Sequence, residues 1–345
     1  MPIPHIIAIG ISFIRASSAA HRSTCGFRKR SIVPGNHNKV TTMLVAHVGR
    51  AALNRSVIPY PALYRGAVVS IALICLAGTQ VVRAQEASSW ETVPHGAARL
   101  IAGETHKSND GVRLRAGVEI QLDPGWHTHW RYPGDSGVPP TFDFAGSENI
   151  KSVTVLWPAP ERFADAAGGY SIGYFGDVVF PLRITALDMA KPSSLHLKLG
   201  YAVCGKLCIP AEADLKLSLS GEKSAEEPIL VAAEKRVPRR VPLGAGTGLS
   251  VRSVSRERGG EHDRVVVEVV APGGIPVDPL VEGPAPDWTL PLPQPIVSAP
   301  SNASELRRFT FDLDGLPSGA NTNDVTLILT AVSRDDAIEV STALR

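Results

Sequence analysis

LHLKLGYAVCGKLCIPAEADLKLSL, residues 195–219, has the clearest secondary-structure pattern in the sequence. Apolar side chains occupy every second position over 195–203 and again over 215–219. A period of two is typical of strands that bury one face and leave the other in water. The segment therefore predicts two half-buried strands, with Cys204 and Cys208 on the connection between them.

Shorter runs of the same kind occur on both sides of this segment and predict further strands. Turn sequences rich in Gly, Pro and Asp separate them, as in a β-sandwich. The runs lie at residues 112–122, 152–156, 178–184, 264–270, 308–313 and 325–332.

A change of composition between residues 220 and 248 predicts a domain boundary. The segment is rich in charged residues, Pro and Gly, which is typical of linkers. A short helix is expected inside it, at 228–235. The sequence therefore predicts two β-sandwich domains, 86–220 and 248–345, joined by a linker at 221–247.

The charge is distributed unevenly along the chain. Residues 1–84 contain ten Lys and Arg and no Asp or Glu. Removing those ten from the 35 basic residues leaves 25 against 33 acidic ones, a balance of about −8. A domain of that sign does not suit nucleic acid or anionic lipid as a partner.

The basic N-terminal part ends in the features of a secretory signal peptide. Arg65 precedes an apolar run at 67–78, and the small residue Ala84 offers a cleavage site. We therefore expect 1–84 to be a presequence and signal peptide, with Met43 as an alternative start, and the mature protein to be periplasmic. The alternative is an uncleaved membrane anchor, although the uncharged stretch barely reaches the ~17 to 25 residues of a spanning helix.

Cleavage after Ala84 would change how the cysteines are interpreted. Cys25 and Cys75 would be removed, which leaves Cys204 and Cys208 as the only thiols of the mature protein. In an oxidising compartment, a lone pair at close spacing is expected to form a disulfide at least part of the time.

The connection between the two cysteines suits such a bond. We expect one strand to end near Val203 and the next to begin near Ala211, and the intervening residues include Gly205. So tight a connection can bring the two Cα atoms within the ~4.4 to 6.8 Å that a disulfide requires.

Two roles remain open for this pair. A structural staple gains little stability from closing so short a loop. A redox-active pair is favoured by Lys206, because a neighbouring positive charge stabilises the thiolate that attacks a disulfide.

Four further segments of the sequence form a recognisable set of motifs. They are GWHTHWRYPGDSGVPP (125–140), WPAPERF (157–163), GYFGD (173–177) and CGKLCIPAE (204–212). With these motifs the sequence resembles the N-terminal periplasmic domain of the DsbD family over about residues 95–220, and less closely beyond. It is most similar to the copper-sensitivity-suppressor branch (ScsB type), which also has three residues between its cysteines.

The resemblance implies an immunoglobulin-like fold, so we predict an all-β protein of two tandem immunoglobulin-like β-sandwich domains. It also implies thiol:disulfide interchange through Cys204 and Cys208, with Cys208 forming the mixed disulfide and Cys204 resolving it. Tyr174 and Phe175 match the cap loop that shields the pair until a partner docks, which protects a thiolate from nonspecific oxidation.

The implied partners are a membrane-embedded electron donor of the DsbD or CcdA type and thioredoxin-fold proteins of the periplasm. Family members continue into a transmembrane domain that this sequence does not contain, so a separate membrane protein is expected to supply the electrons. The spacing of the cysteines also differs from the five intervening residues of the DsbD proteins proper.

A copper-binding module is the alternative function. His127 and His129 are two residues apart, so a strand would place both imidazoles on one face, where with Cys204 and Cys208 they could bind Cu(I). Histidines flanked by tryptophans are also common as packing residues. The third possibility is an adhesion-like sandwich with an inert disulfide.

Other chemistries find little support in the sequence. The tetrapeptide at 134–137, GDSG, is similar to the nucleophile segment of trypsin-like proteases, but the following Val138-Pro139-Pro140 favours a turn between strands. No phosphate-binding or nucleotide-binding motif occurs, so we expect no cofactor.

Overall fold

The computed structural model describes residues 85–108, 111–165, 168–259, 263–296, 305–323 and 325–344. The chain divides into two compact units, 1–78 and 79–345, and the described residues all belong to the second. The predicted presequence, signal peptide and alternative start at Met43 lie outside the described residues. Within those residues, no helix is long and apolar enough to cross a membrane.

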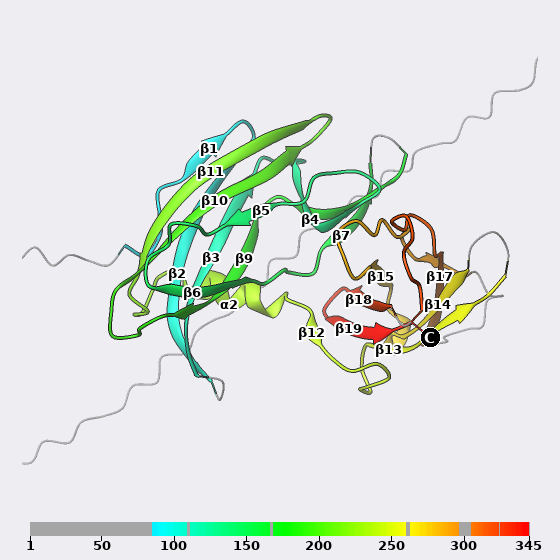
Figure 1. The fold of residues 1–345 in the computed structure, drawn as a ribbon. Coiled ribbons are helices and arrows are strands. Elements are labelled where there is room, and N and C mark those ends of the chain that lie inside the picture. Colours follow the sequence, from blue (N-terminus) through cyan, green and yellow to red (C-terminus); the bar gives the residue numbers. More distant parts are fainter. Residues whose placement is uncertain are drawn as a thin grey trace, which may run out of the picture. The chain divides into compact units, whose positions relative to one another are not determined.

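The first part of the described chain, up to residue 219, forms two antiparallel sheets (Figure 1). One sheet has the order β1-β2-β3-β9-β6. Its strands are β1 (Glu91–Val93), β2 (Gly96–Ser108), β3 (Gly111–Leu122), β9 (Val178–Ala186) and β6 (Ile150–Val155). The other has the order β11-β10-β4-β8-β7, with β5 on β10. Its strands are β11 (Cys208–Leu219), β10 (Ser193–Cys204), β4 (His127–Gly134), β8 (Tyr170–Phe175), β7 (Glu161–Ala164) and β5 (Thr141–Asp143).

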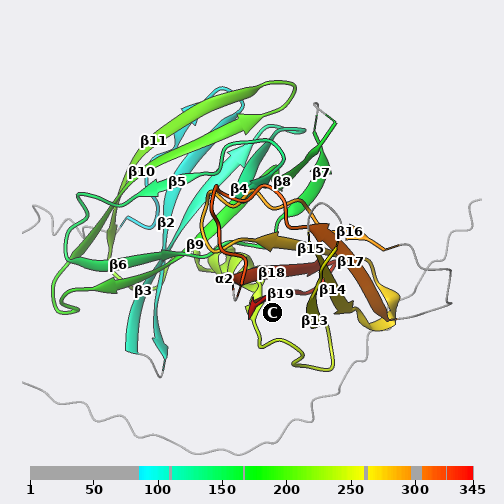
Figure 2. The ribbon, with the colours of Figure 1, turned by 45° about the vertical axis from the view of Figure 1, so that its right-hand side comes forward.

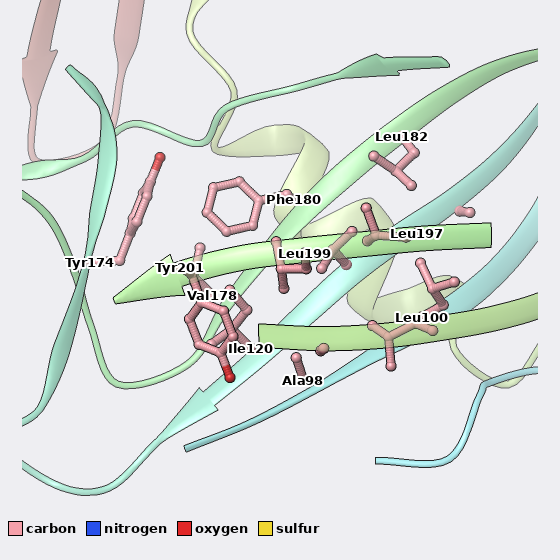
Figure 3. Packing of buried hydrophobic residues seen from close by; sticks show 14 of the residues in the cluster. Ala98, Leu100, Ile120, Tyr174, Val178, Phe180, Leu182, Leu197, Leu199 and Tyr201 are labelled. Carbon is pink, nitrogen blue, oxygen red and sulfur yellow. The ribbon is translucent and has the colours of Figure 1, made fainter. Parts of the chain in front are cut away.

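A hydrophobic core fills the space between these two sheets (Figure 3). The alternating leucines of β10 are inside it, since Leu197 and Leu199 are almost fully buried against side chains such as Phe180 of β9 and Leu100 of β2. The intervening positions of β10 face away from this core. The period of two in the sequence therefore corresponds to one buried face, as expected.

The second part of the chain forms two smaller four-stranded sheets with a separate hydrophobic cluster. One sheet has the order β12-β19-β18-β15, with β12 (Arg239–Arg240), β19 (Ala337–Ala343), β18 (Thr326–Ser333) and β15 (Val277–Glu282). The other has the order β13-β14-β17-β16, with β13 (Ser250–Glu257), β14 (Arg264–Val270), β17 (Leu306–Asp312) and β16 (Gln294–Pro295). The short 3-10 helix η1 (Pro272–Gly274) follows β14 at a predicted turn.

The predicted linker contains the helix α2 (Glu227–Lys235), which matches the helix expected at 228–235. Both ribbon views place α2 beside β9 (Figure 1 and Figure 2). Leu230 of α2 is fully buried, and its methyl groups lie over Gly103 of β2 and Gly117 of β3. The helix of the predicted linker is therefore packed on a sheet of the first sandwich, because the side chain of Leu230 fills the space above the two glycines.

The all-β, sandwich-type fold class is confirmed. The strands of the central hairpin are longer than expected, because the pairing of β10 with β11 continues through Ile209 and Pro210 to the cysteines themselves. The division into domains at 86–220, 221–247 and 248–345 stays a prediction.

Candidate functional site

The two cysteines close the hairpin of β10 and β11. Cys204 is the last residue of β10, Cys208 is the first of β11, and the two are directly paired. Their sulfur atoms form a disulfide with an S–S distance of 2.07 Å and a Cα–Cα distance of 4.0 Å. This separation is slightly shorter than the ~4.4 to 6.8 Å expected for a disulfide.

The disulfide belongs to a row of side chains that crosses four strands. Cys208 pairs with Cys204, Cys204 pairs with His127 of β4, and His127 pairs with Phe175 of β8. Directly opposite residues in a sheet point to the same face. Since the neighbouring Val203 belongs to the core between the sheets, this row lies on the outer face of the sheet.

Three rings surround the imidazole of His127 on that face. Its imidazole lies 4.6 Å from the ring of Phe163 and 5.2 Å from the ring of Phe175, measured between centroids. His129, two residues further along β4, lies 5.4 Å away on the same face. The expectation that both imidazoles share a face is therefore confirmed, since both lie in strand β4.

The two cysteine residues differ sharply in accessibility. Cys204 is completely buried, whereas Cys208 is exposed at the rim of a hollow of about 370 Å³. The neighbouring Leu207, in the tip of the hairpin, is 79 % exposed. The hollow is lined by Cys208, His127 and Phe175 of this row, by His129 and Phe163, and by the two loops that follow β4 and β7.

These two loops are tied to each other by hydrogen bonds. The Ser136 hydroxyl donates to the Asp165 carboxylate at 2.7 Å, and the Tyr170 amide donates to the Asp135 carboxylate at 2.9 Å. Gly137, at φ +125°, lets the first loop close over His129, because a Cβ atom there would lie 2.4 Å from the imidazole. Asp135 and Ser136 thus hold a turn, as the sequence predicts, rather than a nucleophile.

The tip of the hairpin rests on an aromatic side chain. A Cβ atom at Gly205 would lie 3.2 Å from the indole of Trp126, so any larger residue would require the indole to move by a few tenths of an ångström. The indole also stacks on the imidazole of His95, at 3.9 Å between ring centroids. The loop between the cysteines therefore packs on Trp126, which the sequence did not single out.

Burial controls the protonation of the two imidazoles near the disulfide. Desolvation lowers the pKa of His127 below its ordinary value of 6.5. Desolvation and the positive charge of His127 together lower the pKa of His129 to about 4. Both rings are therefore neutral near pH 7, and each offers a nitrogen lone pair.

The two residues predicted as a cap loop have different positions. Tyr174 lies within strand β8 and is buried in the core, where its hydroxyl donates to the carbonyl of Pro158 at 2.9 Å. It points away from the disulfide because adjacent residues of a strand face opposite sides. Phe175 ends the strand, is 46 % exposed and lines the hollow. The aromatic partner of Phe175 over His127 is Phe163, which the prediction missed.

The strands that carry the site also contact the second pair of sheets. Arg131 of β4 donates to the carboxylates of Glu282 and Glu339 at 2.6 Å and 2.8 Å. Arg162 of β7 forms an ion pair with Asp278 at 2.7 Å. Arg162 is adjacent to Phe163 and Arg131 is two residues from His129, so these ion pairs restrain the strands β4 and β7 that form the wall of the site.

Comparisons with known proteins agree on the first pair of sheets. Residues 97–220 match the family described as thiol:disulfide interchange protein DsbD, N-terminal. The crystal structure of the N-terminal periplasmic domain of ScsB from Proteus mirabilis has a TM-score of 0.56 and 22 % identity, covering 75 % of this chain and 98 % of that chain. This larger share takes in strands of the second pair of sheets, and at this identity the likeness concerns the fold. No curated protein matches the sequence.

Proposed function

We propose, from the match of residues 97–220 to the DsbD N-terminal family, that this protein is an exported thiol-disulfide exchange protein. In this proposal Cys204 and Cys208 pass electrons to thioredoxin-fold proteins of the periplasm. A membrane-embedded donor of the DsbD or CcdA type reduces the pair again. The link to copper tolerance that the resemblance implies stays a prediction.

The observation that carries the proposal is the difference in burial between the two sulfurs. Cys208 is exposed at the rim of the hollow, and Cys204 is completely buried beside it. A partner can therefore reach one sulfur only, which makes Cys208 the site of the mixed disulfide and Cys204 the resolving thiol. This supports the assignment implied by the family.

Two exchange steps complete the transfer. The thiolate of Cys208 attacks the partner's disulfide, which forms a mixed disulfide and releases one thiolate on the partner. The thiolate of Cys204 then attacks the sulfur of Cys208, restores the bond between them and releases the partner's second thiolate. Two electrons and two protons pass to the partner, whose disulfide is reduced while the pair of this protein is oxidised.

The pairing of the hairpin favours this role over a structural staple. The cysteines are already held together by the ladder of β10 and β11, which pairs twelve residues on each strand. A disulfide that closes a three-residue loop adds little to such a ladder, because it removes little entropy from the unfolded chain. Opening the bond therefore leaves the sheet intact.

The surroundings of Cys208 suit an apolar docking surface. Leu207 and Phe175 are both exposed. Leu207 precedes Cys208 in the hairpin, and Phe175 lines the same hollow as Cys208. Isolated exposed apolar residues are common, but here two of them border the accessible sulfur. A thioredoxin-fold partner with an apolar surface around its cysteines would cover them on docking.

Trapping of a mixed disulfide tests the proposal. The probe is a thioredoxin variant that lacks its resolving cysteine and carries thionitrobenzoate on the remaining one, so that thionitrobenzoate leaves when the bond to this protein forms. The Cys204→Ser variant retains the accessible thiol but lacks the resolving one, so we expect it to accumulate a stable mixed disulfide. The Cys208→Ser variant retains only the buried thiol and should accumulate none. Equal trapping by the two variants would contradict the roles, and no trapping by either would contradict exchange with a thioredoxin fold.

A matched pair of leucine variants tests the docking surface. Leu207→Ser should slow trapping in the Cys204→Ser background, because it removes an apolar contact next to Cys208. Leu187→Ser is the control, since Leu187 is similarly exposed, at 68 %, but lies after β9 and does not line the hollow. An equal effect of both changes would show that the hairpin tip does not contact the probe.

A further inference from the structure

Three potential metal ligands lie close together beside the disulfide, and two of them line the hollow. They are His127 and His129 of β4 and Cys204 of β10, and one donor atom from each lies within 4.8 Å of the other two. The strands bring them together because Cys204 is paired with His127, and His129 follows on the same face. The exchange reaction proposed above does not require either imidazole.

One of these ligands has an unused donor atom in a buried position. His129 is 1 % exposed, and its Nδ1 atom has no hydrogen-bond partner within the described part of the chain. An unpaired buried polar atom costs free energy, and such atoms in native proteins call for an explanation. A bound ion would satisfy this nitrogen.

The chemistry of the donors selects the kind of ion. A thiolate and two neutral imidazoles suit thiophilic cations such as Zn(II) and Cu(I), whereas hard cations prefer oxygen ligands. At bond lengths of about 2.0–2.1 Å to nitrogen and 2.3 Å to sulfur, donors around one ion lie about 3.5 Å apart. The donor atoms lie up to 4.8 Å apart, so side-chain movements of about 1 Å would bring them to bonding distance of one ion.

We propose that reduction of the Cys204–Cys208 disulfide creates a binding site for one thiophilic d10 cation, held by Cys204, His127 and His129. In the oxidised protein the sulfur of Cys204 is bonded to Cys208 and is not available. A dithiol reductant supplies two electrons and two protons to the disulfide and is itself oxidised to a disulfide. The ion then displaces the proton of the Cys204 thiol and binds the thiolate.

Whether the metal occupies this site therefore depends on the redox state of the Cys204–Cys208 pair. Cys208 is exposed at the rim and can complete the coordination or leave it open. A bound ion would hold Cys204 as a metal thiolate, so it would compete with the resolving step of exchange. The inference goes beyond the proposed function and does not depend on the identity of the protein partner.

Metal titration of the purified protein tests this inference. Zn(II) and, under anaerobic conditions, Cu(I) are added in competition with a chromophoric chelator, to the oxidised protein and to protein reduced with a non-coordinating phosphine. We expect one equivalent of Zn(II), Cu(I) or both to bind the reduced protein and none to bind the oxidised protein. Binding of one ion and not the other identifies the cation, and binding of neither overturns the proposal.

Variants separate this site from the exchange function. Cys208→Ser cannot form the disulfide, so it should bind metal without reductant although it should fail in exchange. His127→Phe and His129→Gln should each weaken binding by more than the roughly 10- to 100-fold that follows loss of an outer-shell partner. The control His106→Gln changes an exposed histidine of β2 outside the cluster and should have no effect.

Co(II) provides a readout that does not depend on affinity alone. A Co(II) thiolate has a sulfur-to-metal charge-transfer band, which should be present in Cys208→Ser and absent in Cys204→Ser. The opposite result, with the band in Cys204→Ser only, would place the metal at the rim and overturn the ligand set. Affinities unchanged in both histidine variants would do the same.

Discussion

The buried side chain of Leu230 makes helix α2 part of the first sandwich, and replacing it with alanine should strongly destabilise that sandwich. Leu230 is fully buried, and its two methyl groups lie 2.5 Å and 2.7 Å from the positions where Cβ atoms would stand on Gly103 and Gly117. Leu230 therefore packs directly on the backbone of β2 and β3, and this backbone cannot shift to fill a cavity.

The position of helix α2 on the sheet is also restrained. Arg115, a nearly buried side chain of β3, forms ion pairs with Glu227 and Glu234, one at each end of α2. The helix therefore cannot settle into the space that the lost methyl groups leave. Buried Leu→Ala changes cost about 2.7–5 kcal/mol, more where the cavity persists, so we expect Leu230→Ala to lower the free energy of unfolding by about 4 kcal/mol.

Urea unfolding followed by tryptophan fluorescence measures this change. Four of the five tryptophans, at positions 90, 126, 130 and 157, belong to the first pair of sheets, so the signal reports mainly on that part. The control is Ile229→Ala, which alters a 37 % exposed neighbour on the same helix and should cost less than about 1 kcal/mol. If the two variants lost the same small amount, α2 would be the independent linker that the sequence first predicts, and the packing argument would be refuted.

Three further predictions concern the hairpin, the core and the N-terminus. Gly205→Val should destabilise the protein by about 1–3 kcal/mol, because the new side chain would overlap the indole of Trp126; an unchanged urea midpoint would contradict that contact. Burial raises the pKa of Tyr201 to about 12 from 10, so stability is complete below pH 10 and falls as the pH rises toward 12, by at most about 2.7 kcal/mol. Tyr201→Phe should remove that loss in alkaline urea titrations and cost little at pH 7, because the hydroxyl has no partner within the described residues. N-terminal sequencing of the exported protein should begin at Gln85, and any uncleaved product would favour the membrane anchor instead.

Periodicity was sufficient to predict most strands and the fold class. The alternation at 195–203 and 215–219 corresponds to the buried faces of β10 and β11, and the run at 264–270 coincides with β14. These predictions depend on residues close in sequence, whose side chains must alternate between the two faces of a strand.

The arrangement of the site could be predicted only in part. The spacing of His127 and His129 was enough to place both on one face, and the spacing of the cysteines was enough to predict their bond. The neighbours of His127 were not predictable, because Phe163 reaches it through the pairing of β7 with β8 and of β8 with β4. The burial of Tyr174 was not predictable for a related reason, since one position along a strand decides between the hollow and the core.

The reduction potential of the Cys204–Cys208 pair tests the central claim most directly. It is measured on the purified protein by thiol alkylation after equilibration across a glutathione series. A pair that exchanges electrons should have a potential between about −270 mV and −120 mV, the range from thioredoxin to the strongest periplasmic oxidants. A potential below about −300 mV would mean a bond that stays closed, and would contradict the account in favour of a structural disulfide.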